Sequence, residues 1–252
     1  MAEITFFLII AILAFICEYI DASIGMGYGT TLTPLLLIIG IQPLQAVPAV
    51  LISQLSSGLV ASLLHHKFKN VNFSLKSIDT KVTFVLAMCG IIGAVIAVLV
   101  AIRLSSFILR IYIGSMVLTV GILTLTAKVK TNFSWKKILG LGLISSFNKG
   151  ISGGGYGPVL TCGQVLSGTE SKHAVGRTTL AEAVTCLASV LIYIATQVVV
   201  YWDIVAPLVI GSTLSTPLSA YTVKKVKERK LKNLVGYASI TLGIITLIKI
   251  FI

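Results

Sequence analysis

Residues 24–40 of the chain read IGMGYGTTLTPLLLIIG, and residues 151–168 read ISGGGYGPVLTCGQVLSG. The shared Gly-Tyr-Gly at 27–29 and 155–157 sets an offset of 128 residues between the two stretches. At that offset, without gaps, 11 of the 39 positions from 25 to 63 are identical to their counterparts. A constant offset over such a length indicates an internal repeat. The chain is therefore predicted to contain two related halves, 1–127 and 128–252, within a single domain.

The composition around these stretches is that of an integral membrane protein. Of the 252 residues, 56% are apolar and only 11% are charged, and the mean hydropathy is +1.00. Soluble domains carry about a quarter charged residues, whereas a membrane-spanning helix needs about 20 mainly apolar residues. Seven stretches meet that requirement: 4–24, 47–64, 82–102, 107–126, 175–195, 204–223 and 234–252. We expect an all-α, multi-pass membrane protein whose first segment is a permanent helix and not a signal peptide.

Each half follows the same plan of a long apolar helix, a glycine cluster, a short apolar segment and three longer helices. The short segments, 30–40 and 158–168, have 11 residues each, or about 16 Å as a helix. That is about half of a ~30 Å hydrocarbon core. Each repeat is therefore predicted to comprise about five helical segments, including a glycine-rich break and a half-helix.

The distribution of Lys and Arg indicates the topology. If the short segments do not carry the chain across the membrane, eight basic residues lie on one side and nine on the other. If they do, sixteen lie on one side, within residues 67–81, 127–137, 172–177 and 224–232, against Arg103 and the helix-end residues Arg110 and Lys249. The positive-inside rule favours the second arrangement. It predicts both termini outside the cell membrane and, with five passes per half, two repeats inserted in inverted orientation.

Inverted repeats with broken helices are typical of secondary transporters, whose sites lie near the midplane where half-helix N-termini point at anionic groups. The glycine clusters are thus predicted to bind a small anion through backbone N–H groups. The competing interpretation is that these small residues only allow close helix packing. The predicted substrate-binding residues of the clusters are Gly25, Gly27, Tyr28, Gly29, Gly153, Gly154, Gly155, Tyr156 and Gly157.

The paired motifs, the size and the duplication resemble the sulfite exporter TauE/SafE family of membrane permeases, over essentially the whole chain. The resemblance rests on the two stretches 24–40 and 151–168, with a following helix that begins in Ala-Val in each half. It implies transport of sulfite, organosulfonates or related small sulfur-containing anions.

Ionisable residues within membrane segments are costly and are functional by default. Lys149 and Asp21 correspond at the repeat offset, as do Glu182 and Gln54. Two interpretations of Lys149 remain open: it binds the substrate charge, or it forms an ion pair with Asp21 that braces the two halves. Glu18, Asp21, Gln54 and Glu182 are predicted to act in coupling or gating. Further candidate anion-binding side chains are Thr33, Asn148, Thr161, Gln164, Thr178 and Thr179.

Three classes of function were weighed. The leading one is a secondary transporter of a small sulfur-containing anion, and the alternative is an anion channel that uses the same glycine-lined path. A membrane enzyme or redox carrier would need a metal cluster, a nucleophile–base set or paired cysteines, and the sequence has none of these patterns. It also has no P-loop, so no enzyme activity, cofactor or metal is predicted. The expected partners are the small anion and the lipid bilayer, with a homo-oligomer left open. Nucleic acid is not expected, because the net charge of +12 is explained by loops that flank membrane helices.

Overall fold

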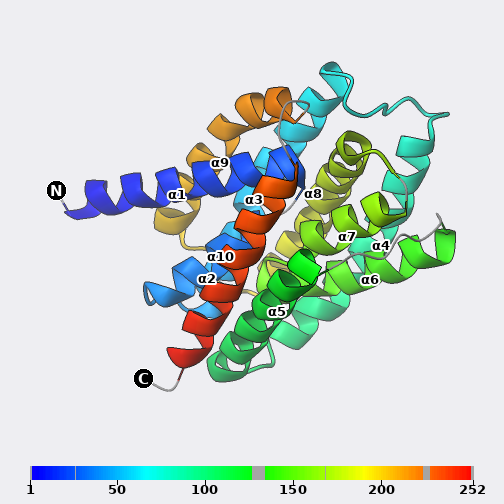
Figure 1. Ribbon diagram of the computed structural model, residues 1–252. Helices are drawn as coiled ribbons and strands as arrows, with labels where there is room; N and C mark the ends of the chain where they lie inside the picture. Colours follow the sequence, from blue (N-terminus) through cyan, green and yellow to red (C-terminus); the bar gives the residue numbers. More distant parts are fainter. Residues whose placement is uncertain (1, 26, 127–133, 168, 224–227, 251–252) are drawn as a thin grey trace.

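The computed structural model describes residues 2–25, 27–126, 134–167, 169–223 and 228–250. Within these ranges the chain forms ten helices and no strand (Figure 1). Six helices, α1, α3, α4, α5, α8 and α9, are long and apolar enough to cross a membrane, which confirms the predicted all-α membrane fold. The helices are α1 (Ala2–Ile24), α2 (Tyr28–Ile38), α3 (Pro43–Lys67), α4 (Ile78–Ala101), α5 (Ser106–Thr126), α6 (Trp135–Ser152), α7 (Tyr156–Leu166), α8 (Ser171–Ala195), α9 (Trp202–Thr222) and α10 (Glu228–Ile248).

The two short helices, α2 and α7, have 11 residues each. Both begin two residues earlier than the sequence predicts, because the last glycine before the tyrosine in each cluster is the N-cap. Gly27 has φ 130° and Gly155 has φ 78°, backbone conformations that side chains with a Cβ rarely adopt. Pro158 lies in the first turn of α7, where its missing N–H costs no helical hydrogen bond. The glycines therefore turn the chain and start the half-helices.

The two halves interlock and do not form separate bundles. Helix α9 of the second half packs against α1 and α3 of the first half, and α4 of the first half packs against α6 and α8 of the second (Figure 1). At the repeat offset α1 corresponds to α6, α3 to α8 and α4 to α9, so each of these contacts has its counterpart. Helices α5 and α10, the last of each half, pack against each other. The fourth helix of each half, α4 or α9, thus packs mainly against helices of the other half.

Small residues bring these helices together. A Cβ placed on Gly211 of α9 would lie 2.0 Å from the carbonyl oxygen of Ala11 in α1, and one on Gly90 of α4 would lie 2.2 Å from Thr185 Oγ1 in α8. Glycine is needed at both positions because membrane helices gain their stability from close backbone packing. Large apolar side chains such as Leu63, which is 71% exposed, cover the outer faces, as expected of a surface that faces lipid.

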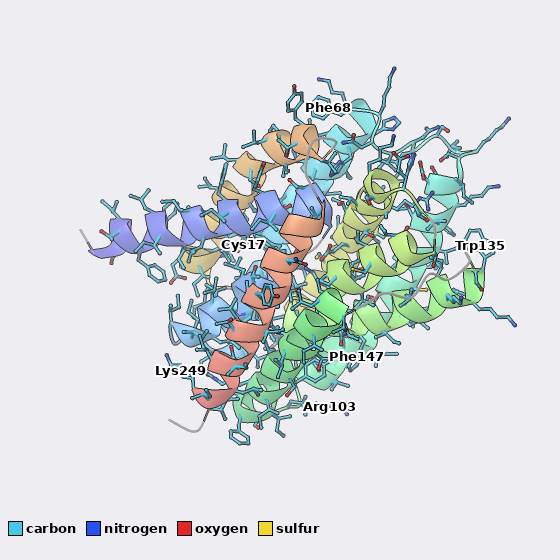
Figure 2. The ribbon with its side chains drawn as sticks, viewed as in Figure 1. Cys17, Phe68, Arg103, Trp135, Phe147 and Lys249 are labelled. Atoms are coloured by element: carbon cyan, nitrogen blue, oxygen red, sulfur yellow. The ribbon has the colours of Figure 1, made fainter. Side chains whose placement is uncertain are left out.

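Side-chain contacts show which loops share an end of the molecule. Arg177 Nε at the start of α8 donates to Asp79 Oδ1 at the start of α4 at 2.6 Å, so residues 67–81 and 172–177 lie at one end. Arg110 donates to Gln42 Oε1 at 3.2 Å, and Lys249 donates to the Ile38 carbonyl. In Figure 2, Phe68 and Trp135 lie toward one end, and Arg103 and Lys249 toward the other.

Candidate functional site

The two glycine breaks lie directly against each other. A Cβ on Gly29 would fall 1.7 Å from the carbonyl oxygen of Gly153, and a Cβ on Gly157 would fall 2.3 Å from the carbonyl oxygen of Gly25. These two contacts are related by the repeat offset. The structure thus brings the predicted clusters into backbone contact, at the junction of the two halves.

One repeat-related pair of hydroxyl groups flanks this junction. Thr161 of α7 lies over Gly25 and Thr33 of α2 lies over Gly153. Both hydroxyl oxygens are buried without a hydrogen-bond partner in the described part of the chain, as is the hydroxyl of Tyr156. Because buried polar groups are nearly always hydrogen-bonded, the hydroxyls of Thr33 and Thr161 have hydrogen-bonding capacity that the described residues leave unused.

One hydroxyl near the junction was not predicted. Thr30 Oγ1 accepts a hydrogen bond from the backbone N–H of Gly155 at 3.0 Å and so joins α2 to the N-terminus of α7. The repeat counterpart of Thr30 is Pro158, so the sequence comparison gave no sign of this contact. The position of Thr30 in the first turn of α2, directly after the glycine break, was the one sequence feature that could have indicated this contact.

A cluster of buried charged and amide side chains lies beside the breaks. Lys149 Nζ is 2.8 Å from Glu182 Oε1 and donates to Gln54 Oε1 at 2.5 Å. Gln54 Nε2 in turn donates to Asp21 Oδ2 at 2.7 Å. All four side chains are at most 7% exposed, and Lys149 is fully buried. Gln54 and Glu182 lie near the middle of the 25-residue helices α3 and α8, both of which are long and apolar enough to cross a membrane.

The partner of Lys149 differs from the one that the sequence suggested. The repeat offset paired Lys149 with Asp21, but the Gln54 amide lies between them and Glu182 is the direct ionic partner. The reason is the packing of the helices that carry these residues. Helix α6, which carries Lys149, packs against α8 as well as α3, and Glu182 is the acidic residue of α8 within reach of the Lys149 ammonium group. The four residues nevertheless form two repeat-related pairs, Asp21 with Lys149 and Gln54 with Glu182.

The remaining candidates lie around this centre at different places. Gln164 Nε2 of α7 donates to Thr178 Oγ1 of α8 at 3.0 Å, and its Oε1 has no partner among the described residues. Thr179 donates to the Val175 carbonyl of its own helix. Asn148 accepts from the hydroxyl of Tyr112 at 2.5 Å, on the side of α6 that faces α5. The structure therefore brings Gln164 and Thr178 together and directs Asn148 away from Lys149.

A second ionic cluster closes one end of the molecule. Asp79 accepts from Arg177 at 2.6 Å, lies 3.0 Å from His173 Nδ1, and accepts the Asn72 backbone N–H at 2.8 Å. It joins the loop before α4 to the start of α8. Asp79 and Arg177 are 98 residues apart, so no sequence spacing indicates their contact.

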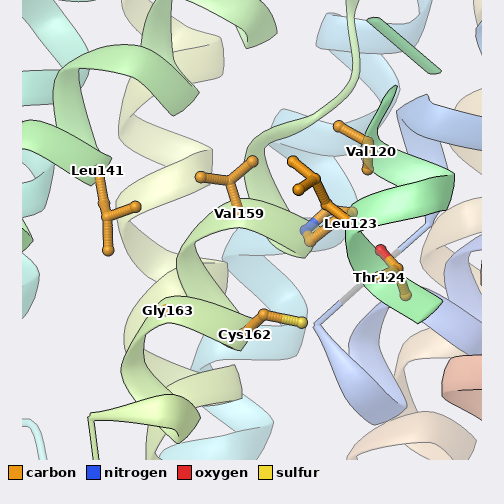
Figure 3. A pocket seen from close by; sticks show the side chains of 8 residues that line it. Val120, Leu123, Thr124, Leu141, Val159, Cys162 and Gly163 are labelled. Atoms are coloured by element: carbon orange, nitrogen blue, oxygen red, sulfur yellow. The ribbon is translucent and has the colours of Figure 1, made fainter. Parts of the chain in front are cut away.

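An apolar cavity of about 200 Å³ lies between α5, α6 and α7, on the outer side of the second half-helix (Figure 3). Its lining is almost entirely apolar, and Figure 3 shows the sulfur of Cys162 pointing toward α5, where Thr124 lies. A neighbouring cavity of about 380 Å³ shares Val120, Leu123 and Val159 with it. The apolar lining suits hydrocarbon and not an inorganic anion.

This cavity predicts a reactivity difference among the cysteines. Cys17, Cys89 and Cys186 are buried, whereas Cys162 is partly exposed. An uncharged, lipid-soluble maleimide is therefore expected to modify Cys162 at least about tenfold faster than the other three, because reaction requires access to the sulfur. Mass spectrometry of the labelled protein measures the rates, with Cys162→Ser as the control. Faster modification of Cys186 would contradict the packing of α8.

Comparison with known proteins agrees with this architecture. The family model described as "Sulfite exporter TauE/SafE" matches residues 10–246. The chain is also 29% identical, over 257 aligned positions, to a Bacillus subtilis (strain 168) protein called "Probable membrane transporter protein YtnM". That alignment covers 96% of this chain and 82% of the relative.

Proposed function

Because the chain belongs to the sulfite exporter TauE/SafE family, we propose that it is a secondary transporter that moves a small sulfur-containing anion, such as sulfite or an organosulfonate, across the cell membrane. The family and the relative support a membrane transporter. The sulfur-containing anion is proposed as the substrate because the family is described as that of sulfite exporters.

The anion binds where the two breaks meet. One observation carries this assignment: a fully buried lysine, Lys149, lies four residues before the αL glycine Gly153, beside two apposed half-helices. Half-helix N-termini present free N–H groups and the positive end of the helix dipole to an anion. The unpartnered hydroxyls of Thr33 and Thr161 supply hydrogen bonds to its oxygen atoms. Opening of this closely packed junction admits the anion.

The main test is counterflow in proteoliposomes. Vesicles preloaded with unlabelled substrate are expected to take up labelled sulfite, thiosulfate or methanesulfonate transiently and saturably, because a carrier exchanges bound substrate. A preceding thermal-shift screen of sulfite, sulfate, thiosulfate and sulfonates in detergent selects the anion, since a ligand that binds the native state raises its melting temperature. An electrical current without counterflow would instead favour the channel. Transport of none of these anions would refute the assigned substrate class.

The orientation in the membrane is part of the proposal. Both termini lie outside, and the two repeats have inverted orientations. The charge distribution supports this, as does the contact of Asp79 with Arg177, which joins two of the basic loops at one end. Residues 127–133 and 224–227 of the other two basic loops lie outside the described residues.

Single cysteines in a background without native cysteines test this orientation. Cysteines at Lys76, Lys136 and Arg229 are expected to resist a membrane-impermeant maleimide in intact cells and to react after permeabilisation. Arg103→Cys, at the opposite end, is expected to react in intact cells and so controls for reagent access. Labelling of one of the three basic loops but not the others in intact cells would rule out two inverted repeats of five passes each.

A further inference from the structure

The buried cluster beside the breaks contains more acids than bases. Its ionisable members are Glu18 and Asp21 on α1, Glu182 on α8 and a single lysine, Lys149 on α6, all at most 7% exposed. Three carboxylates against one ammonium would leave two buried negative charges. Uncompensated charge there is costly, so a cation must accompany these carboxylates.

Two of the three carboxylates have donors that compensate a negative charge. Glu182 is paired with Lys149 at 2.8 Å. An ammonium group has no acceptor, so Lys149 orients the amide of Gln54 with its oxygen toward Nζ and its NH₂ toward Asp21. Asp21 Oδ2 therefore accepts a hydrogen bond. The Asp21 carboxylate also interacts with the backbone N–H of Tyr28 at the start of α2, where the helix dipole favours negative charge.

Glu18 is the third carboxyl group, and it is poorly compensated. It is 1% exposed, and its Oε2 has no hydrogen-bond partner in the described part of the chain. It lies one turn before Asp21 on the same helix. Among the charged groups that act on it, Asp21 and Glu182 are acidic and only Lys149 is basic. The hydroxyl of Ser57 on α3 offers this carboxyl group a hydrogen bond.

The titratable groups around Glu18 come from all the helices that contribute to the cluster. They are Cys17 and Asp21 of α1, Tyr28 of α2, Lys149 of α6, and Glu182 and Cys186 of α8. No group of three or more His, Cys, Asp or Glu side chains within the described ranges is arranged to hold a metal ion. A carboxyl group binds a proton without any such set of ligands.

We propose that Glu18 is a proton-binding site and that its proton accompanies the anion, which makes the protein a proton–anion symporter. The symport rests on the proposed anion transport, whereas the proton on Glu18 does not. The anion adds negative charge to the cluster and the proton removes it, so each strengthens the binding of the other. By linkage the two effects are equal. No bond is formed other than the O–H bond of the Glu18 carboxyl group, which breaks when the proton leaves.

The first test reads the proton directly. Infrared spectra of the purified protein at neutral pH are expected to show the C=O band of a protonated, buried carboxylic acid. The band should be lost in Glu18→Gln and kept in Glu3→Gln, the same change at an exposed position of the same helix. Thermal unfolding verifies that both variants are folded. A band that persists in Glu18→Gln and disappears in Asp21→Asn would overturn the assignment.

The second test measures whether a pH gradient drives anion uptake, in proteoliposomes with the membrane potential clamped at zero. Methanesulfonate is a suitable probe because it takes up no proton itself near neutral pH. One pH unit, acid outside, is expected to drive about tenfold accumulation by the wild type and by Glu3→Gln, since one unit corresponds to 1.36 kcal/mol. Glu18→Gln should give no pH-driven accumulation, and its counterflow is measured in the same vesicles. Accumulation driven by sodium and not by pH, or pH-driven accumulation by Glu18→Gln, would overturn the symport.

If the wild type moves no anion at all, the proposed function fails, and the symport fails with it. The infrared result still decides whether Glu18 holds a proton.

Discussion

Replacement of Lys149 by methionine is expected to abolish anion transport and to lower the free energy of unfolding by about 3–5 kcal/mol, the usual result of removing one partner of a buried ion pair. The carboxylate of Glu182 would be left in the membrane interior without its ammonium partner, which lies 2.8 Å away. Gln54 would also lose the donor that orients its amide. Anion counterflow and thermal unfolding in detergent measure the two effects.

The double change Lys149→Met with Glu182→Gln separates binding from structure. It removes both charges, so stability is expected to return close to that of the wild type, while transport stays absent because the anion has lost its counter-charge. Asp21→Asn is the matched control. Its amide oxygen still accepts from Gln54 Nε2, so anion binding is expected to persist or tighten. A fully active double variant would remove Lys149 from the site and leave the anion to the backbone N–H groups alone.

Gly29→Ala is expected to have the second-largest effect. Its Cβ would fall 1.7 Å from the carbonyl oxygen of Gly153, and backbone atoms of two helices must then separate. Overpacking of this kind costs about 1–3 kcal/mol and sometimes more. Transport should be lost because the two breaks no longer meet. Counterflow and the melting temperature are the measurements.

The chain offers matched variants for this prediction. Gly157→Ala places a Cβ 2.3 Å from the carbonyl oxygen of Gly25. It should lower transport and the melting temperature as Gly29→Ala does. Gly140→Ala, on α6 with no atom within 4 Å of the added Cβ, should have wild-type activity. Gly155→Leu adds the strain of φ 78° and should abolish transport while the protein still inserts. Normal transport by Gly155→Leu would show that the cluster serves only ordinary packing.

The half-helices and their glycine breaks were predictable because their causes are local. Positive φ at the caps requires glycine, and eleven apolar residues cannot span the hydrocarbon core. The sequence also identified Asp21, Gln54, Lys149 and Glu182, since buried charge is rare and the repeat offset relates them in pairs. It did not identify which of them bond, because the contact of Lys149 with Glu182 depends on how α6 packs against α8.

Other features depend wholly on tertiary structure. Thr30 differs from its repeat counterpart, Pro158, so its hydrogen bond to Gly155 breaks the symmetry on which the prediction relied. Asp79 and Arg177 are distant in sequence and meet only because the folded chain brings the starts of α4 and α8 together. The exchange of α4 and α9 between halves likewise has no local pattern, because an apolar helix can pack against many others.

That exchange has a consequence for biogenesis. Helix α1 leaves the ribosome before its main packing partner, α9, which is synthesised about 200 residues later. At 5–20 residues per second this delay is roughly 10–40 s. During that time the acidic face of α1, with Glu18 and Asp21, lies in the translocon or in lipid without its final neighbours. Protection of this helix by the insertion machinery is therefore expected until α9 has entered the bilayer.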